Sequence, residues 1–444
     1  MCKSNMRKVL VITYHFPPYR TGGVYRHLKF AKYLSRYGWY PYILTAKNPS
    51  KHKQDLSLMK DIPPSLPIYL TYSIEPDGVE EGLINLKNRF LPKDSVPDNH
   101  KFILFKIINK LLSTYLLIPD DKVGWLPHTI LKSAQLIKRE NIDSICTTSP
   151  PHSTHLIGLL LKKIIGIPWI ADFRDPWSHS FMKRPFYDKF KFRYRLEKMM
   201  EGTVLAACDR IITVSKGHRD NLLNNISNIS QEKIKVITNG FDDDDFEGQD
   251  ISRKENDQSK FLITHIGRVY PGKSYAFLAC LKNLIEENSH FARNIVVSFV
   301  GHPSNHHREV VNRLGLAQYV RFEGFHDRNN AIKDMLSSDL LLLMVGEENN
   351  WIPGKLFEYL RAKKPIFVIG EEGDATRIAQ ESGLGIVVSP KNIHQVKEKL
   401  LEIYQKKMNG DVIVKPNHAY INTYNRTQLT SEFAGVLNDT TLSP

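Results

Sequence analysis

The chain has 444 residues and a formal net charge of +14 at neutral pH. Its hydrophobic content of 41% excludes a mainly disordered chain, and the length suggests two or three domains. The four cysteines lie far apart, which excludes a disulfide framework and zinc-finger spacing and favours a reducing, cytoplasmic compartment.

The positive charge favours contact with phosphates on a soluble ligand, on nucleic acid or on an anionic bilayer. The sequence contains no zinc finger, RNA-recognition motif or basic low-complexity tail, so we expect no nucleic-acid partner. No stretch of about 18 apolar residues is free of charge, and residues 1–18 lack the layout of a signal peptide. The sequence therefore predicts no membrane span.

The first predicted unit is a strand over residues 8–13, a loop containing Gly22 and Gly23, a helix over 24–37 and a strand over 40–45. A strand, a glycine-rich turn and a helix let a ligand approach the helix N-terminus. The glycine pair alone favours a simple tight turn over a ligand-binding loop. The complete βαβ unit around it makes these two alternatives more nearly equal.

Residues 47–100 are polar and contain many prolines, which predicts a long irregular insertion. In residues 101–118, lysines alternate with large apolar residues. Two alternatives remain open there. One is a basic amphipathic helix on an anionic bilayer, which would place the protein peripherally on the inner face of the cell membrane. The other is a core helix whose lysines lie at its wet edge.

Two further strands are each followed by a loop that carries candidate site residues. A strand over residues 142–147 leads to His152, which could donate to a phosphate or a sugar hydroxyl, or only pack on the next helix. The next strand leads to Asp172, Arg174 and Asp175, which could form a structural ion-pair knot or hold the hydroxyls of an acceptor. Both alternatives stay open for each loop.

The predicted first domain comprises residues 1–245 and closes with strands over 209–215 and 233–241. The acidic run 242–245 and the polar stretch up to residue 260 suggest a linker. The predicted second domain, 259–420, repeats the βαβ rhythm, and residues 421–444 form a helix and tail that we expect to pack back on the first domain. Two doubly wound α/β domains would face each other across a cleft.

The second domain contains the motifs that organise the chain. A buried strand over residues 261–266 breaks at Gly267 and delivers Arg268 and Lys273 to one loop edge. A Pro-Gly turn then opens a helix that carries Glu358. Two cations, a helix N-terminus and a carboxylate make a cradle for a nucleoside diphosphate.

Together these motifs resemble glycosyltransferase family 4, the retaining enzymes of the GT-B fold, over about residues 9–390. The resemblance implies a retaining hexosyltransferase that acts in surface-polysaccharide biosynthesis. Its donor would be a nucleotide sugar, and its acceptor a glycan or a polyprenyl-linked glycan. It implies no cofactor and no metal, because cations would stabilise the departing diphosphate. We expect Arg268 and Lys273 to do this and His152 to lie near the transferred sugar.

The resemblance also assigns donor-binding residues. It implies that Glu358 binds ribose, that backbone at Gly22, Gly23 and Gly267 approaches the donor, and that further contacts come from Gly354, Lys355, Leu356, Phe325 and His326. One departure matters: Asn350 occupies the position where the family often has a glutamate, eight residues before Glu358. An amide hydrogen-bonds a sugar hydroxyl without the strength of a carboxylate.

Other functions remain as alternatives. A nucleotide-sugar 2-epimerase would act without an acceptor, and a non-catalytic partner would bind nucleotide without turnover. A dinucleotide oxidoreductase is disfavoured, because no Gly-x-Gly-x-x-Gly follows a strand.

Overall fold

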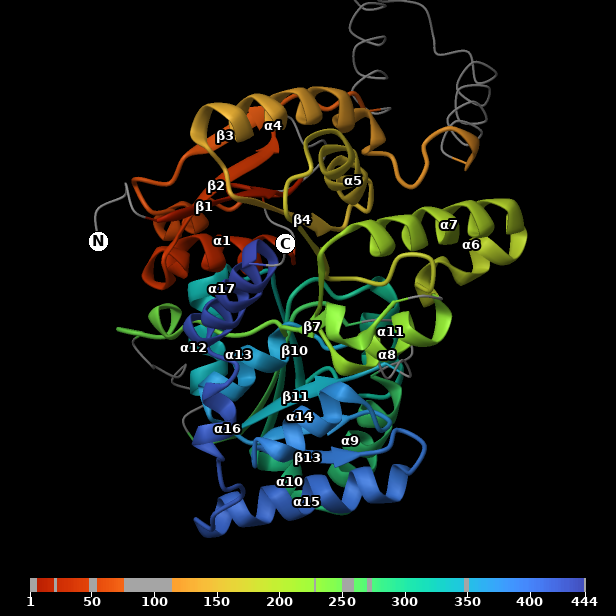
Figure 1. The fold of residues 1–444 in the computed structure, drawn as a ribbon. Coiled ribbons are helices and arrows are strands. Elements are labelled where there is room, and N and C mark those ends of the chain that lie inside the picture. The colour runs from red at the N-terminus through yellow and green to blue at the C-terminus, as the bar shows by residue number, and fades with distance from the viewer. Residues whose placement is uncertain are drawn as a thin grey trace, which may run out of the picture. The chain divides into compact units, whose positions relative to one another are not determined.

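The computed structural model describes residues 6–19, 22–47, 54–75, 114–226, 229–249, 259–269, 274–346 and 351–442. The chain divides into two compact units (Figure 1). Unit 1 comprises residues 1–214, 218–237 and 430–444, and unit 2 comprises 215–217 and 238–429. Within the ranges given, no helix combines the length and the apolar character that crossing a bilayer requires.

Unit 1 contains a seven-stranded parallel sheet in the order β3-β2-β1-β4-β5-β6-β7. From β1 the chain builds outward through β2 to β3, and β4 then returns to pair with the other side of β1. The order therefore reverses between β1 and β4. The strands are β1 (Arg7–Ile12), β2 (Trp39–Ala46), β3 (Ile68–Thr71), β4 (Ser144–Ser149), β5 (Trp169–Phe173), β6 (Arg210–Thr213) and β7 (Ile234–Val236).

Helices cover both faces of this sheet, with α4 and α5 on one face and α1 and the end of α17 on the other (Figure 1). Phe30 of α1 stacks on Phe433 of α17 with ring centroids 4.9 Å apart, which fixes the end of the chain on unit 1. The helices are α1 (Val24–Tyr33), α4 (Leu126–Glu140), α5 (Ser153–Ile165), α6 (Arg184–Lys189), α7 (Lys191–Ala207), α8 (Lys216–Asn225) and α17 (Arg426–Leu442).

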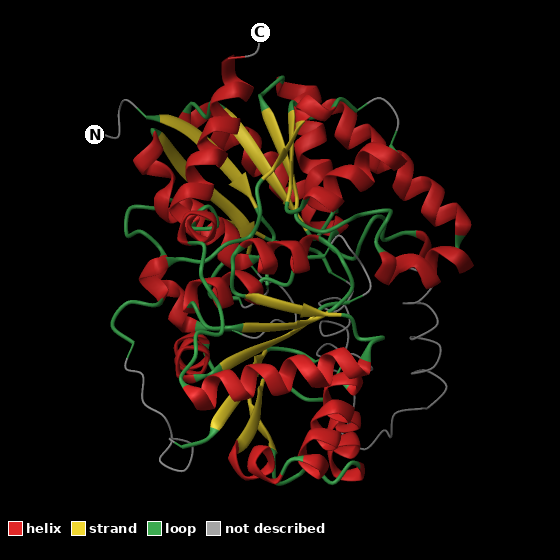
Figure 2. Cartoon of the chain, turned by 90° about the horizontal axis from the view of Figure 1, so that it is seen from below, coloured by secondary structure: helices red, strands yellow, loops and turns green. Residues whose placement is uncertain are grey.

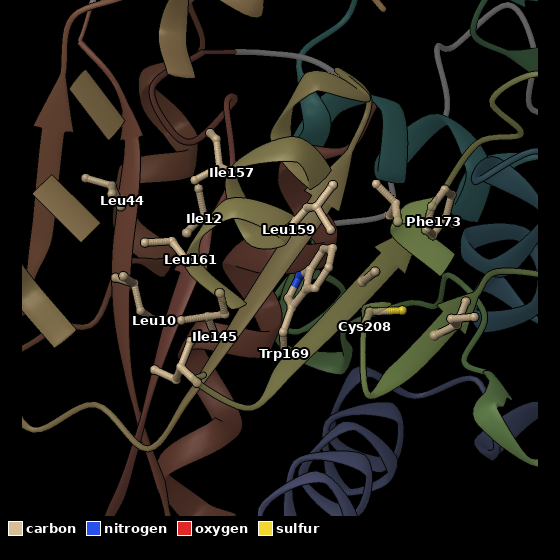
Figure 3. Close-up of a cluster of buried hydrophobic side chains, with 14 of the residues drawn as sticks. Leu10, Ile12, Leu44, Ile145, Ile157, Leu159, Leu161, Trp169, Phe173 and Cys208 are labelled. Carbon is tan, nitrogen blue, oxygen red and sulfur yellow. The ribbon is translucent and has the colours of Figure 1, made fainter. Parts of the chain in front are cut away.

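The core of unit 1 lies between α4, α5 and the sheet, and Trp169 is at its centre (Figure 3). The indole nitrogen of Trp169 donates to the Thr147 hydroxyl at 2.8 Å, so its polar atom is satisfied in an otherwise apolar setting. A Cβ at Gly158 would lie 2.2 Å from the Trp169 ring. The absence of a side chain at Gly158 is therefore what lets α5 lie this close to β5.

Unit 2 contains a six-stranded parallel sheet in the order β10-β9-β8-β11-β12-β13, again one layer between helices (Figure 2). Alternate residues of β11 face two different cores: Leu340 and Leu342 belong to one, and Leu341 and Leu343 to the other. The strands are β8 (Phe261–Ile266), β9 (Ile295–Val300), β10 (Val320–Gly324), β11 (Leu340–Met344), β12 (Ile366–Ile369) and β13 (Gly385–Val388). The helices are α9 (Tyr275–Glu287), α10 (Ser289–Asn294), α11 (Asn305–Arg313), α12 (Arg328–Ser337), α13 (Lys355–Ala362), α14 (Asp374–Glu381), α15 (Ile393–Asn409) and α16 (His418–Asn422).

Two doubly wound α/β units are confirmed, and two details of their strands and helices differ from the prediction. The predicted insertion contains a short 3₁₀ helix over Leu56–Asp61 and the edge strand β3. Strand β3 was not predicted because its residues are half exposed and prolines lie next to it in the sequence. Strand β13 lacked a predicted counterpart. Most of the basic segment 101–118, residues 101–113, lies outside the described residues.

The acidic run that suggested a linker is packed on unit 2. Asp243–Asp245 form a 3₁₀ turn, and Phe241 and Phe246 on either side are buried in a core of unit 2. Asp243 pairs with Arg361 of α13 and accepts from Asn425. These contacts order residues 241–246 at the start of unit 2, whereas residues 250–258 of the predicted linker lie outside the described residues.

Candidate functional site

The unit 2 site lies where the strand order reverses. From β8 the chain continues to β9 on one side, and β11 pairs with β8 on the other. Loops after β8 and after β11 therefore leave the sheet in opposite directions at its carboxyl edge, which is where sheets of this type bind ligands. Gly267 and Arg268 follow β8, and the α13 N-terminus is reached from β11.

Three neighbouring strands end in glycines that the backbone geometry requires. Gly267, Gly301 and Gly324 follow or end β8, β9 and β10 with φ of +94°, +139° and +79°. The Gly267 amide donates to the Val300 carbonyl at 2.6 Å, and the Gly301 amide donates to the Gly324 carbonyl at 2.6 Å. A Cβ at Gly301 would lie 2.5 Å from the Gly267 oxygen. Side chains are thus excluded where a ligand would approach the backbone, and Arg268 beyond Gly267 is exposed.

Lys355, the first residue of α13, lies beside the Gly267 turn. Its Nζ is 3.0 Å from Nε2 of His265, a buried residue of β8, and 3.4 Å from where a Cβ at Gly267 would lie. His265 Nδ1 lies 2.9 Å from the Leu342 carbonyl, which can only accept, so Nδ1 carries the hydrogen and Nε2 accepts from lysine. Burial, and then the charge of Lys355, hold the pKa of His265 well below its usual range. A neutral imidazole therefore holds this cation at the strand end.

The α13 N-terminus has fewer backbone amides available to a ligand than the sequence predicted. The Leu356 amide donates to the Pro353 carbonyl at 3.0 Å, and its side chain is buried in the core. Gly354, the N-cap residue, is exposed. The backbone at Gly354 and Lys355 thus forms the exposed part of this helix end, where the helix dipole favours an anion.

Glu358 lies on the first turn of α13 and is held by an arginine that the sequence did not indicate. Glu358 Oε1 is 2.6 Å from Nη1 of Arg328, the first residue of α12. Nη2 of Arg328 is 2.7 Å from the buried Asp245 carboxylate. The acidic turn, α12 and α13 are therefore joined by one guanidinium, which fixes the Glu358 carboxylate at its position.

The remaining predicted donor contacts lie in the loop after β10. Phe325 is 48% exposed and stacks on His302, with ring centroids 6.0 Å apart and an angle of 16° between the planes. His326 Nδ1 is 2.6 Å from the Asp334 carboxylate. The exposed, stacked pair of rings after β9 and β10 is the kind of flat surface on which a nucleobase stacks. Lys273 and Asn350 lie outside the described residues.

Unit 1 has its own reversal point, between β1 and β4. The loop after β1 carries Gly22, which is exposed, and Gly23, the N-cap of α1. A Cβ at Gly23 would lie 1.0 Å from Nη1 of Arg174. The Arg174 guanidinium therefore occupies the space of a side chain at position 23, and both lie at the N-terminus of α1.

His152, the N-cap of α5, follows β4 on the other side of the reversal point. Its ring is 5% exposed and stacks on Trp177, with ring centroids 5.1 Å apart and 7° between planes. Burial, and then the charge of Lys183, hold the pKa of His152 well below its usual range, and Arg174 acts in the same direction. His152 is therefore neutral at physiological pH and can both donate and accept.

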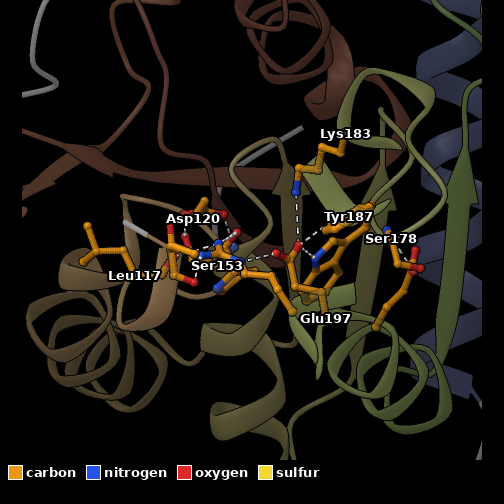
Figure 4. A network of polar contacts seen from close by, with 12 residues as sticks. Leu117, Asp120, Ser153, Ser178, Lys183, Tyr187 and Glu197 are labelled. Carbon is orange, nitrogen blue, oxygen red and sulfur yellow. Dashed lines mark hydrogen bonds and ion pairs between the residues drawn. The ribbon is translucent and has the colours of Figure 1, made fainter. Parts of the chain in front are cut away.

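A polar network from α7 holds the loop after β5, which carries Arg174 and Trp177 (Figure 4). Glu197 accepts from Trp177 Nε1 at 3.0 Å, from the Tyr187 hydroxyl at 2.7 Å and from Lys183 Nζ at 3.1 Å. Arg193 also pairs with Glu197, at 2.7 Å. This buried carboxylate thus positions the indole against which His152 stacks.

Asp172 does not face an open surface. Its carboxylate accepts from Arg26 Nε at 2.9 Å and Nη2 at 3.1 Å, and lies 2.8 Å from His27 Nε2. Asp172 and Arg26 are almost completely buried. These contacts fit the ion-pair alternative for Asp172, whereas Arg174 and Asp175 are partly exposed and lie further along the loop.

Glu201, one turn after Glu197, gives a testable pH dependence. It is buried and accepts from the amide and hydroxyl of Ser178, and burial raises its pKa from 4.5 to about 7. A carboxyl group whose folded-state pKa is raised costs stability as the pH rises through the interval between the unfolded and folded values. The wild type should therefore lose up to roughly 3 kcal/mol of unfolding free energy from pH 5 to pH 8 that Glu201→Gln does not lose. Urea denaturation at both pH values measures this, and identical pH dependence in the two proteins would contradict it.

Comparison with known proteins agrees with the geometry. Residues 97–245 match the model of Glycosyltransferase Family 4, which confirms the resemblance seen in the sequence. Comparison with curated protein sequences gives no match.

Solved structures match almost the whole chain. A glycosyltransferase from Rickettsia africae ESF-5 is 17% identical with a TM-score of 0.63, and covers 99% of this chain and 100% of its own. Anabaena Alr3699/HepE in complex with UDP and glucose is 14% identical with a TM-score of 0.62, covering 98% and 100%. The sucrose-phosphate synthase from Thermosynechococcus elongatus is 12% identical with a TM-score of 0.63, covering 98% of both chains. The fold is therefore that of the GT-B glycosyltransferases, as predicted.

Proposed function

From the family 4 match over residues 97–245 and the GT-B fold, we propose that this protein is a retaining, metal-independent hexosyltransferase. It transfers a sugar from a nucleotide sugar to a glycan or lipid-linked glycan in surface-polysaccharide biosynthesis, in the cytoplasm or peripherally on the membrane. One observation carries the proposal: Arg268, Lys355 and the α13 N-terminus belong to the reversal point of the unit 2 sheet. Support for the donor comes from the Anabaena structure with UDP and glucose.

The proposed chemistry is electrostatic. Breaking a glycosyl phosphate bond places negative charge on the departing diphosphate and leaves an oxocarbenium-like sugar. Preorganised cations and amides stabilise that negative charge most when they need not reorganise. The neutral His265 holds Lys355 at the strand end, and Arg268 leaves the same edge beyond Gly267. Glu358, fixed by Arg328, supplies a carboxylate for ribose hydroxyls.

The donor is found by a thermal-shift screen of nucleotide sugars, since a ligand bound only by the folded state raises its stability. We then expect release of UDP or GDP from that donor only when a glycan or lipid-linked glycan acceptor is supplied. Conversion of the donor without an acceptor would instead indicate an epimerase. Binding without turnover over a full acceptor panel would favour a non-catalytic partner.

A further inference from the structure

One guanidinium in unit 2 binds two carboxylates that come from distant parts of the chain. Arg328 Nε and Nη2 both donate to Asp245 Oδ2, at 3.1 and 2.7 Å, and Arg328 Nη1 donates to Glu358 Oε1 at 2.6 Å. The Asp245 side chain is 3% exposed, whereas that of Glu358 is 21% exposed. A guanidinium carries its donors in a rigid planar fork. One edge of this fork therefore faces a buried carboxylate, and the remaining nitrogen holds a carboxylate that solvent reaches.

The elements that carry Arg328 and Asp245 are themselves fixed. Helix α12 begins at Arg328, and the preceding Asp327 caps it by accepting from the Asn330 amide at 2.8 Å. Asp245 ends a 3₁₀ turn, and the next residue, Phe246, is buried in a core of unit 2. The guanidinium therefore has little freedom to move, and the carboxylate bound to it is held in turn.

The second oxygen of Glu358 is left for a ligand. Among the residues that the structure describes, no group donates a hydrogen bond to Glu358 Oε2. A carboxylate oxygen has two lone pairs, so Oε2 can accept from one or two hydroxyl groups. A mobile glutamate loses rotamer freedom when it binds such a group, and this loss weakens affinity. Because Arg328 already orders Glu358, a ligand that binds Oε2 does not have to order the side chain.

We infer that Arg328 is a positioning residue for the donor: it holds Glu358 so that Oε2 accepts from the ribose hydroxyls, and Asp245 in turn holds Arg328. The inference rests on the proposed function and deepens it, because it makes the recognition of ribose depend on an acidic turn far from Glu358 in the sequence. Arg328 acts only through Glu358. Its effect should therefore appear only with nucleotides that have ribose hydroxyls.

The test compares UDP and GDP with their 2′,3′-dideoxy forms by isothermal titration calorimetry on the full chain. The wild type should bind one of the two diphosphates more tightly than its dideoxy form, and Glu358→Gln should reduce that difference. Arg328→Gln should weaken the hydroxyl-bearing diphosphate about three- to tenfold, the effect of ordering one long side chain, and change the affinity for the dideoxy form by less than about twofold. Added to Glu358→Gln, Arg328→Gln should not reduce the difference further.

The matched control is Arg361→Gln. Arg361 of α13 pairs with Asp243 of the same acidic turn and, within the described residues, makes no ion pair with Glu358, so its removal should keep the wild-type ratio of affinities. Arg328→Gln strands the buried Asp245 charge, which can prevent folding. In that case the double variant, Asp245→Asn with Arg328→Gln, removes both charges and should show the same loss with the hydroxyl-bearing diphosphate.

The other outcomes overturn the inference in distinguishable ways. Unchanged affinities, or an equal loss for both forms of the nucleotide in the Arg328 variant, would mean that Arg328 does not act on ribose recognition. A further reduction in the Glu358→Gln background would mean that Arg328 contacts the ribose itself, and the same loss in Arg361→Gln would assign the effect to the whole turn. A wild type that binds a diphosphate without distinguishing its dideoxy form would overturn the inference and keep the proposed function. Binding of neither UDP nor GDP would reject the proposed function, and the inference with it.

Discussion

Replacing Arg268 with alanine is expected to lower kcat/KM by about 100- to 1,000-fold, which corresponds to about 3 to 4 kcal/mol of lost transition-state stabilisation. Arg268 is exposed directly after Gly267, at the reversal point of the unit 2 sheet. Removing it should leave the leaving diphosphate with one fewer preorganised cation. Steady-state kinetics with the donor found by the nucleotide-sugar screen measure the effect.

The matched control is Arg313→Ala, which removes an exposed arginine at the end of α11 and should leave kcat/KM unchanged. Both variants should melt at the wild-type temperature, because exposed substitutions cost little stability. Near-normal turnover by the Arg268 variant would refute its role. An equal loss in both variants would mean that general charge, rather than position, decides the rate.

Replacing Asp172 with asparagine is expected to lower the free energy of unfolding by about 3 to 5 kcal/mol, since removing one partner strands a buried charge. Arg26 would keep its positive charge in a site where it is fully buried and would lose its bidentate acceptor. Urea denaturation followed by tryptophan fluorescence reports on this unit, because four of the five tryptophans are buried there: Trp39, Trp125, Trp169 and Trp177.

The control for this variant is Asp175→Asn, three residues further along the chain in the loop after β5 and partly exposed, which should cost less than about 1 kcal/mol. Burial alone would raise the pKa of Asp172, but Arg26 and His27 outweigh it and hold the pKa well below its usual range. The stability that Asp172 contributes is therefore complete above the unfolded-state pKa of about 4 and is lost as the pH falls further. The deficit of Asp172→Asn should be constant from pH 5 to pH 8, and a deficit that grows at acid pH would contradict the ion-pair role.

Much of the fold could be predicted because its central strands are short apolar runs that end in turn residues. Phe261–Ile266 and Ile295–Val300 are buried on both faces, and strands buried in this way consist of nearly continuous runs of hydrophobic residues. The edge strands β3 and β13 are half exposed, so their residues carry a mixed pattern. Residues at the edge of a sheet contact fewer neighbours, so their side-chain types are less constrained and predict the strand less well.

Site residues could be predicted where functional side chains directly follow the end of a strand. They could not be predicted where the site depends on contacts between residues that are distant in sequence. Gly267 and Arg268 stand next to their strand and could be placed from sequence. The clamp of Arg328 between Asp245 and Glu358 joins residues 83 and 30 positions apart. The contact between Arg174 and Gly23 likewise joins two loops that meet only because β1, β4 and β5 are neighbours in one sheet.

The most direct test of the account is hydrogen–deuterium exchange of the full chain with and without the nucleotide sugar found in the screen. The account predicts slower exchange in the turns after β8, β9 and β10 and at the start of α13, around Gly267, Gly301, Phe325 and Lys355. Protection confined to other parts of unit 2, with these four places unchanged at saturating ligand, would contradict it.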